Sequence, residues 1–324
     1  MRAVICRELT GVGGLACVDN WPEPQAGPGE VVVEVRAAAL NFPDLLMIQG
    51  LYQERPALPF VVGTEMSGVV AAVGEGVTHL APGDRVVAAC GRTLAERVAA
   101  KAALVIPAPR KLDFEAAAGI CITYFTSLHA LKQRAQLQAG ETLLVLGAAG
   151  GVGTTAVELG KQMGAVVIAA ASSDAKLDLV RRLGADHVIN YTTQDLRERV
   201  KEITGGKGVD VVYDPVGGAL AEPALRSMAW RGRYLVVGFA GGDIPRIPLN
   251  LPLLKGCSVV GVYWGSFAQR ERDEQRRNVA ELWEMFESGR LVPVVGETHE
   301  LAGYAAAFDS LASRRAQGKV VVRP

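Results

Sequence analysis

Leu146-Gly147-Ala148-Ala149-Gly150-Gly151-Val152-Gly153 decides the fold of the second half of this chain. This stretch follows an apolar run typical of a buried strand, residues 143–146, and precedes a helix-compatible segment, residues 154–163. A glycine-rich turn between strand and helix lets phosphates approach the backbone N–H groups of a helix N-terminus, where a Cβ would block them. We therefore predict a dinucleotide pyrophosphate site here. The alternative is tight helix–strand packing without a ligand, and Ala148 stands where the usual fingerprint has its first glycine.

Strand-like and helix-like segments alternate from about residue 115 to 265. After the first strand, apolar runs recur at residues 166–170, 187–189, 209–213, 233–237 and 258–262. Continuously apolar strands separated by helices indicate a parallel sheet that is covered on both faces. We expect a doubly wound α/β domain in this part of the chain.

The first 110 residues have a different pattern, in which short β-branched runs are separated by Pro/Gly turns. This pattern is typical of an antiparallel barrel or sandwich, with a short helical insertion at residues 40–50 that Pro43 opens. After about residue 265, a charged helix (270–286), a second short helix (302–311) and a terminal strand (319–323) remain. They are too few for a domain, and we expect them to return to the first one.

Composition limits the partners of the chain. Its 324 residues correspond to about two domains, and its 34 basic and 34 acidic residues balance to a net charge of zero. This neutrality argues against a nucleic-acid partner and against a polybasic membrane anchor. Five widely spaced cysteines without a C-x-x-C pair suggest a reducing compartment. With no signal-like or membrane-spanning apolar run, we expect a cytoplasmic protein and no membrane partner.

The end of the second strand of the α/β half discriminates between cofactors. An NAD enzyme places an acid there to bind the ribose 2′-OH, but this chain has Ala169-Ala170-Ala171-Ser172-Ser173-Asp174-Ala175-Lys176. The Ser172 hydroxyl followed four residues later by Lys176 suits a 2′-phosphate, which favours NADP(H). Alternatively, Ser173 only caps the next helix and Lys176 is solvated. Asp174 could bind the ribose, although we expect it inside the helix start.

Eight motifs in a fixed order cover nearly the whole chain. They are Asn41-Phe42-Pro43-Asp44, Gly50-Leu51-Tyr52, Leu58-Pro59-Phe60-Val61-Val62-Gly63-Thr64-Glu65, Ala148-Ala149-Gly150-Gly151-Val152-Gly153, Gly184-Ala185-Asp186-His187-Val188-Ile189-Asn190-Tyr191, Tyr213-Asp214-Pro215-Val216-Gly217-Gly218, Val259-Val260-Gly261-Val262-Tyr263-Trp264 and Gly318-Lys319-Val320-Val321. With them the chain resembles zinc-independent medium-chain dehydrogenases/reductases of the NADPH:quinone oxidoreductase type, which are related to zeta-crystallin. The resemblance implies a GroES-like β-barrel catalytic domain (residues 1–122 and 267–324), a Rossmann NADP(H)-binding domain (123–266), an active site between them and a homodimer.

The resemblance also bears on metal binding. Zinc-dependent relatives carry a cysteine ligand near the position of Asn41, a histidine at that of Thr64, and a four-cysteine lobe where this chain has only Cys90. A tetrahedral zinc site needs three or four sulfur or imidazole ligands close in space, and the four histidines lie outside these zinc-ligand positions. We expect catalysis without a metal.

The same resemblance assigns the site residues. Asn41 and Tyr52 are the candidate catalytic residues, with Asn41 near the nicotinamide and Tyr52 facing the acceptor. The alternative for Asn41 is an asparagine that only fixes a turn, and the alternative for Tyr52 is an aromatic side chain in a cleft wall. The implied cofactor contacts are Asn41 and Thr123 at the nicotinamide and its ribose, Ala149, Gly150, Gly151 and Val152 at the pyrophosphate, Ser172, Lys176 and Tyr191 at the adenosine phosphate, and Phe239 and Val262 along the nicotinamide.

The resulting prediction is an NADPH-dependent reductase that delivers hydride to a small-molecule quinone or another conjugated carbonyl. Without zinc, such a protein can position the nicotinamide, exclude water and donate hydrogen bonds to the oxygen that gains charge. An enoyl-thioester or enone reductase on the same scaffold is the first alternative, because fold does not determine substrate. A non-enzymatic NADPH-binding protein is the second.

Overall fold

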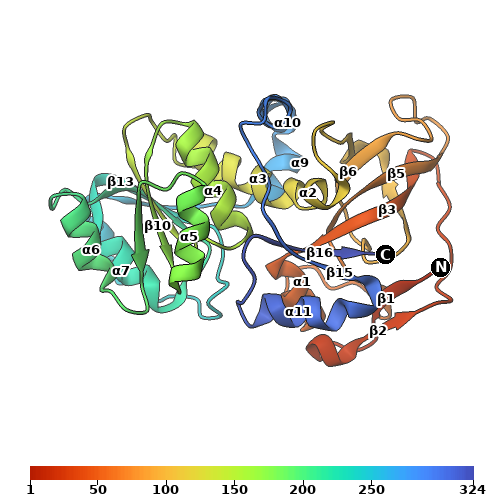
Figure 1. Cartoon of the computed structure of the whole chain (residues 1–324), viewed down its shortest axis with the longest axis horizontal. Coiled ribbons are helices and arrows are strands. Elements are labelled where there is room, and N and C mark those ends of the chain that lie inside the picture. Colours follow the sequence, from red (N-terminus) through yellow and green to blue (C-terminus); the bar gives the residue numbers. More distant parts are fainter. The chain divides into compact units, whose positions relative to one another are not determined.

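The computed structural model describes all 324 residues, which form two compact units (Figure 1). Unit 1 consists of Met1–Ile122 and Val292–Pro324, and unit 2 is Thr123–Leu291. The chain therefore returns to its first unit at Val292, which differs from the expected return at residue 267.

The charged helix that was expected to return, α10 (Arg272–Ser288), belongs to unit 2 because it packs on the helical segment that opens that unit. Lys132 Nζ lies 2.6 Å from Glu281 Oε2, and Gln133 Nε2 donates to Asn278 Oδ1 at 2.9 Å. These contacts arise from side chains about 145 positions apart, and the sequence pattern of α10 alone does not reveal them.

Unit 1 is mainly antiparallel β-structure, as its β-branched runs predict. One sheet has the order β15-β16-β3-β5-β6-β8, with β7 also paired to β3, and a smaller sheet has the order β2-β1-β4. The strands are β1 (Ala3–Cys6), β2 (Leu15–Val18), β3 (Glu30–Leu40), β4 (Phe60–Val61), β5 (Glu65–Val73), β6 (Arg85–Ala89), β7 (Arg97–Lys101), β8 (Val105–Pro107), β15 (Val295–Glu300) and β16 (Lys319–Arg323). Alternate side chains of β3, among them Val31, Val33 and Val35, enter the buried core.

Short helices complete unit 1: α1 (Phe42–Ile48), α2 (Phe114–Ala118), α11 (Tyr304–Ala312) and the 3₁₀ turns η1 (Gly11–Gly14), η2 (Ala102–Leu104) and η5 (Leu301–Gly303). Helix α1 confirms the predicted insertion. Asn41 is its N-cap, Pro43 lies in its first turn, and Asp44 completes a capping box with Asn41.

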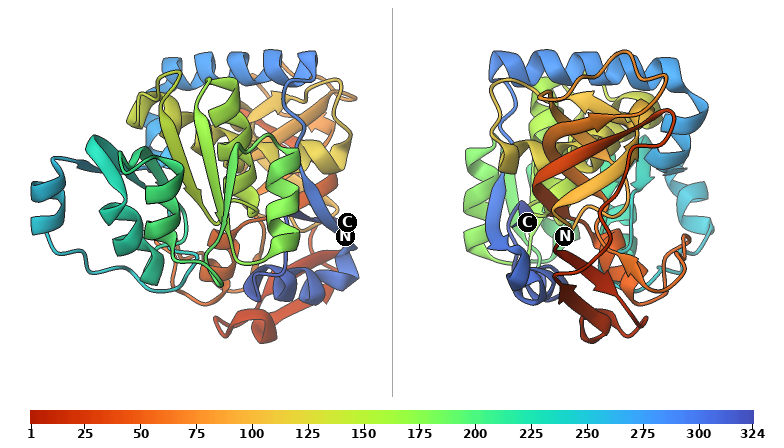
Figure 2. Two further views of the ribbon diagram at one scale, coloured as in Figure 1. Left: turned by 60° about the vertical axis from the view of Figure 1, so that its left-hand side comes forward. Right: turned by 90° about the vertical axis from the view of Figure 1, so that its right-hand side faces the viewer.

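Both ends of the chain build unit 1. Strand β16 lies between β15, with which it pairs in parallel, and β3, with which it pairs in the antiparallel sense. Figure 2 shows the two termini side by side, and Met1 and Pro324 line the same surface hollow. A strand from the end of the chain is thus an interior strand of the main sheet.

Unit 2 is the predicted doubly wound α/β domain. Its six strands are all parallel and have the order β11-β10-β9-β12-β13-β14, which is the Rossmann order. They are β9 (Thr142–Leu146), β10 (Val166–Ala171), β11 (His187–Asn190), β12 (Val209–Asp214), β13 (Met228–Val236) and β14 (Ser258–Gly261). All but one residue of each central strand, β10, β9 and β12, is buried, which explains their largely apolar sequences.

The connections of unit 2 are helical, and Figure 1 shows α4 and α5 beside β10. The segments are α3 (Ile120–Leu128), which crosses the unit boundary, η3 (His129–Arg134), α4 (Gly151–Gln162), α5 (Asp174–Arg182), α6 (Leu196–Ile203), η4 (Gly218–Leu220), α7 (Ala221–Arg226), α8 (Asn250–Lys255), α9 (Trp264–Arg270) and α10. Helix α4 starts at Gly151, three residues before the expected start, because the glycines of the turn already adopt helical geometry.

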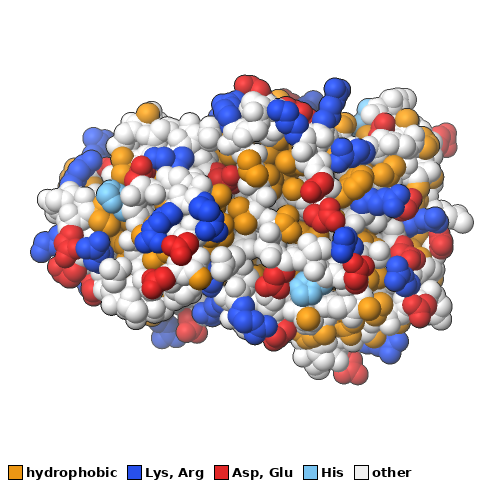
Figure 3. Space-filling model, in the orientation of Figure 1, with side chains coloured by type: hydrophobic (Ala, Val, Ile, Leu, Met, Phe, Trp, Pro, Cys, Tyr) orange, Lys and Arg blue, Asp and Glu red, His pale blue; other side chains and the backbone are white.

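The surface matches the charge balance of the sequence. On the face drawn in Figure 3, basic and acidic side chains are interspersed. No helix combines the length and the apolar character needed to cross a bilayer.

Candidate functional site

Most of the residues predicted for the dinucleotide lie at one edge of the unit 2 sheet. Each follows the carboxyl end of a strand: Ala149 to Val152 after β9, Ser172 after β10, Tyr191 after β11, Phe239 after β13 and Val262 after β14. Open α/β sheets bind ligands at this edge, where the strand order reverses, and here the reversal lies between β9 and β12. The sheet therefore gathers residues that are up to 113 positions apart in the sequence.

The glycine-rich turn contains one glycine required by packing and one that packing does not require. A Cβ on Gly153 would lie 2.3 Å from the carbonyl oxygen of Gly147, so only glycine fits there. A Cβ on Gly150, the N-cap of α4, would meet only that same oxygen, at an ordinary 3.4 Å. Space is therefore left above the helix N-terminus, where a phosphate can approach the backbone N–H groups.

The departure from the fingerprint at Ala148 has a local explanation. Its N–H donates to the carbonyl of Ala170 at 3.0 Å, and its methyl group is completely buried. This alanine faces the core, so its Cβ does not obstruct the turn.

Asp214 fixes the loop on the other side of the strand reversal. Its Oδ1 accepts the N–H groups of Val216 and Gly217 at 2.8 and 2.9 Å, and Tyr234 donates to its Oδ2. Asp214 is 3% exposed. It belongs to a quoted motif but was not predicted as a site residue; its position at the carboxyl end of a strand was the available signal.

Ser172 and Lys176 meet at the end of β10, and Tyr191 directly follows the paired strand β11. Ala171 and Asn190 are register partners, so the residues that follow them leave the sheet side by side. Lys176, from the first turn of α5, donates from Nζ to Ser172 Oγ at 3.3 Å. All three side chains are half-buried. A hydroxyl, an ammonium and a phenol at one strand end form a donor set for a phosphate.

Ser173 and Asp174, the residues of the two alternatives at this strand end, lie at the start of α5. Ser173 is the N-cap residue of α5, but its side chain makes no capping hydrogen bond. Asp174 is the first residue of α5, as expected, and its Oδ1 accepts from Asn190 Nδ2 at 2.9 Å. The carboxylate is thus held by a neighbouring strand end.

Thr123 lies in a buried hydroxyl network of unit 2. Its carbonyl accepts from Thr155 Oγ1 at 3.3 Å, and Ser127 Oγ lies 2.8 Å from both Thr155 Oγ1 and the Tyr213 hydroxyl. Burial raises the pKa of Tyr213. The network ties α3 to α4 and β12. Of these residues, only Thr123 was predicted as a site residue. Ser127 and Thr155 were not, because isolated hydroxyl residues in apolar segments carry no spacing signal.

Unit 1 contains a buried ionic cluster that the sequence did not predict. Lys319 Nζ donates to Glu65 Oε1 at 2.8 Å, to Asn41 Oδ1 at 2.7 Å and to the carbonyl of Leu40 at 2.8 Å. The side chains of Lys319 and Glu65 are 7% and 0% exposed. The other Glu65 oxygen accepts the N–H of Ile122 at 3.0 Å. Such a buried pair is tolerated because its polar atoms are satisfied.

Asn41 is held inside this cluster. Its Nδ2 donates to Glu65 Oε1 at 2.8 Å while its Oδ1 accepts from Lys319, so both ends of the amide are engaged. The residue is 6% exposed. Its contacts support the alternative of an asparagine that organises a turn; a position near the nicotinamide stays a prediction.

Asp44 is the least satisfied member of the cluster. Its Oδ2 accepts from the Asn41 N–H at 2.7 Å and from Thr64 Oγ1 at 3.1 Å, whereas its Oδ1 is buried without a partner. Burial raises the pKa of Asp44 to about 7, against the opposing effects of Asn41, Thr64 and Lys319. The capping-box spacing from Asn41 was the signal that could have identified this residue.

Tyr52, the other candidate catalytic residue, belongs to unit 1. It is half-buried in the loop between α1 and β4, next to Leu51, which is exposed. Asn41 and Thr64, the positions at which the resemblance implies ligands in zinc-dependent proteins, both contact this cluster. No group of three or more His, Cys, Asp or Glu side chains in this chain is arranged to hold a metal ion.

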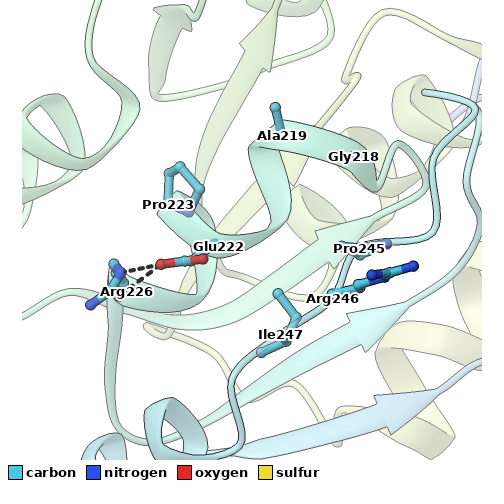
Figure 4. Close-up of a pocket in the computed structure, with 8 residues that line it drawn as sticks. All are labelled: Gly218, Ala219, Glu222, Pro223, Arg226, Pro245, Arg246 and Ile247. Atoms are coloured by element: carbon cyan, nitrogen blue, oxygen red, sulfur yellow. Dashed lines mark hydrogen bonds and ion pairs between the residues drawn. The ribbon is translucent and has the colours of Figure 1, made fainter.

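A separate pocket of about 300 Å³ lies elsewhere in unit 2 (Figure 4). Glu222 and Arg226 of α7 form an ion pair of 2.7 Å in its wall, and Pro245 to Ile247 line it from another loop. It contains none of the residues predicted for the cofactor or the acceptor.

Comparisons with known proteins agree with both units. Residues 27–111 match the alcohol dehydrogenase GroES-like domain, and residues 151–286 match the zinc-binding dehydrogenase family. The quinone oxidoreductase-like protein 2 homolog of Nematostella vectensis is 39% identical over 99% of this chain and 88% of its own length. The bovine quinone oxidoreductase-like protein 2 is 39% identical over 99% of this chain and 92% of its own.

Solved structures show the same fold. Escherichia coli quinone oxidoreductase complexed with NADPH has a TM-score of 0.93 and 31% identity, with both chains fully covered. The CurK enoyl reductase has a TM-score of 0.90 and 26% identity over 99% of this chain and 98% of its own. The GroES-like and Rossmann units expected from the sequence are thereby confirmed. This chain belongs to the medium-chain dehydrogenase/reductase family of oxidoreductases, within its quinone oxidoreductase group.

Proposed function

We propose that this protein is an NADPH-dependent, zinc-independent oxidoreductase that transfers hydride to a quinone or a related conjugated carbonyl. The observation that carries the proposal is the contact of Lys176 with Ser172 at the end of β10, beside the paired end of β11 that Tyr191 follows. An NAD enzyme needs a carboxylate at this strand end. The names of the relatives and the NADPH complex of the Escherichia coli structure support it.

The residues of unit 2 fit the cofactor. The open space at Gly150 would admit the pyrophosphate onto the first-turn N–H groups of α4. Ser172, Lys176 and Tyr191 would hold the adenosine phosphate. When bound, NADPH supplies hydride to the acceptor. Thr123, Phe239 and Val262 would border the nicotinamide.

Tyr52 would serve the acceptor side. A half-buried phenol on a loop can donate a hydrogen bond to the carbonyl oxygen that gains charge, and its ring can stack on a flat quinone. Removing one such donor from an enzyme costs ~10²–10³ in turnover in demanding reactions. Quinones are easily reduced, so a smaller loss of about tenfold is expected for Tyr52→Phe.

Three acceptors test the proposal. NADPH oxidation is followed with a quinone, with an enoyl-CoA and with neither, before and after exhaustive chelation. We expect quinone-dependent oxidation that survives chelation. Preferential oxidation with the enoyl-CoA would support the second candidate, which the CurK enoyl reductase neighbour favours. NADPH binding without turnover on either acceptor would refute both, and activity lost together with stoichiometric zinc would refute zinc independence.

We further propose a homodimer formed through the outer edge of unit 2. Strand β14 ends the sheet and has one unpaired side. Large apolar side chains are exposed on it and on the neighbouring elements β13 and α8: Trp230, Leu253, Leu254 and Val259. An open edge strand beside exposed apolar side chains is suited to pairing with a second copy of the same edge.

A further inference from the structure

We propose that Asp44 and Thr64 deliver the proton of the reaction: Asp44 stores it, and the Thr64 hydroxyl passes it to the acceptor oxygen. This inference rests on the proposed reduction of a carbonyl acceptor, which needs a proton for the oxygen that gains charge. Neither residue has a role in the assignments made from the sequence.

Charge balance in the cluster favours a neutral Asp44. The ammonium of Lys319 contacts Glu65 at 2.8 Å, and these two charges compensate each other. Asp44 has only neutral hydrogen-bond partners, Asn41 N–H and the Thr64 hydroxyl. An ionised Asp44 would therefore leave one negative charge uncompensated in the interior, which is costly.

Asp44 Oδ1, which has no hydrogen-bond partner, also favours the neutral, protonated acid. Asp44 is 1% exposed, and no donor reaches its Oδ1. An anionic oxygen without any donor is among the least stable buried groups, whereas a neutral C=O loses less. The charged groups that act on Asp44 are Lys319, which lowers its pKa, and Glu65, which raises it; burial outweighs both and gives a pKa of about 7.

Thr64 connects the buried acid to the outside of the cluster. Its Oγ1 lies 3.1 Å from Asp44 Oδ2, and its side chain is half-buried, whereas Asp44, Glu65 and Asn41 are buried. A hydroxyl both donates and accepts. With Asp44 protonated on Oδ2, the acid donates to Thr64, and the Thr64 proton is free to be donated outward.

The proton step balances. The Thr64 O–H bond breaks and a new O–H bond forms on the acceptor oxygen, while the Asp44 proton moves to Thr64 Oγ1. Asp44 is left as a carboxylate and regains its proton from water before the next turnover. The two electrons come from the proposed reductant, NADPH, and the acceptor gains one hydride and one proton. Tyr52 would contribute a hydrogen bond and no proton.

Infrared spectroscopy tests the stored proton without cofactor or acceptor. The band of a protonated carboxyl group is titrated from about pH 5 to 9 in the wild type, in Asp44→Asn and in Asp113→Asn. Asp113 is the exposed N-cap of α2 in the same unit, and asparagine caps equally well. We expect a band that titrates near pH 7, survives in Asp113→Asn and disappears in Asp44→Asn. Absence of such a band in the wild type at pH 6 would overturn the proposal.

Turnover with a quinone tests delivery. Wild-type kcat should fall about tenfold per pH unit above pH 7, because only the protonated acid donates. Thr64→Val should lower kcat by ~10²-fold and remove the solvent isotope effect on kcat. Thr64→Ser keeps the hydroxyl and should restore both the rate and the isotope effect. Tyr52→Phe should keep the wild-type pH midpoint.

Failure of the proton relay and failure of the proposed function would give different results. If Thr64→Val reduces quinone at the wild-type rate with an unchanged solvent isotope effect, the relay is wrong and the proposed function stands. If the wild type reduces neither acceptor, the proposed function fails and the relay fails with it, whatever the infrared titration shows.

Discussion

At the scale of single residues, the proposed NADPH preference depends on Lys176 and the proposed proton delivery depends on Asp44. Lys176 and Asp44 are both ordinary in sequence, one in a helix start and one beside a proline. Their chemistry follows from what surrounds them: a serine hydroxyl at 3.3 Å in the first case, and a buried oxygen without a donor in the second.

Lys176→Ala should weaken NADPH binding and leave NADH binding almost unchanged. A charge-assisted hydrogen bond to the 2′-phosphate contributes ~1.5–3 kcal/mol, which corresponds to roughly ten- to a hundredfold in Kd. Dissociation constants for both cofactors, measured by fluorescence titration, check this. Lys201→Ala is the control, because Lys201 lies on an exposed face of α6 in the same unit. Equal losses for NADPH and NADH would show that Lys176 acts through structure.

Asp44 should make the free energy of unfolding fall with rising pH between about 4 and 7. In this window the unfolded chain has released a proton that the native chain still holds, because the folded pKa of about 7 exceeds the ordinary value of 3.8. Each pH unit then costs about 1.4 kcal/mol of stability, and the loss levels off above the folded pKa.

Urea unfolding at about pH 5, 6, 7 and 8 measures this dependence. Asp44→Asn should remove this contribution, so that the difference in unfolding free energy between wild type and variant changes by about 1.4 kcal/mol per pH unit below pH 7. Asp113→Asn should follow the wild type. Parallel curves for wild type and Asp44→Asn would show that Asp44 is already ionised at pH 5.

At the scale of elements, different glycines of the turn from β9 to α4 serve packing and the proposed ligand binding. Gly153→Ala should destabilise unit 2 strongly, because its Cβ would lie 2.3 Å from a backbone oxygen. Gly150→Ala should change stability by about 1 kcal/mol or less, while NADPH binding weakens by about tenfold or more. Thermal unfolding and cofactor titration of the two variants check this contrast. Unchanged NADPH affinity in Gly150→Ala would place the pyrophosphate elsewhere.

The elements also show what the sequence could predict. Apolar strands and the glycine-rich turn are local patterns, so the parallel sheet, helix α1 and terminal strand β16 followed from them. The place of α10 did not, because Lys132, Gln133 and their partners meet only after folding. The Lys319–Glu65 pair was missed for the same reason: two residues 254 positions apart have no spacing signal.

At the scale of the whole molecule, the edge of unit 2 should determine the oligomeric state. Leu254→Glu places a charge in the exposed apolar set on α8, β13 and β14, and should convert a dimer into a monomer because burying an unpaired carboxylate is costly. Light scattering coupled to gel filtration measures the mass. Leu104→Glu, at an exposed leucine of unit 1, is the control. A wild type that is monomeric at micromolar concentration would contradict the proposed interface.

The insertion of β16 between β15 and β3 has a consequence for biosynthesis. Glu65 leaves the ribosome 254 residues before Lys319, an interval of roughly 13–50 s at ~5–20 residues per second. Throughout this time the nascent chain carries a carboxylate whose ammonium partner does not yet exist, and a sheet that lacks an interior strand. Unit 2, by contrast, is one continuous segment that emerges complete during the same interval. Translation therefore reverses the apparent order of assembly: the unit that begins at the N-terminus is the last to close.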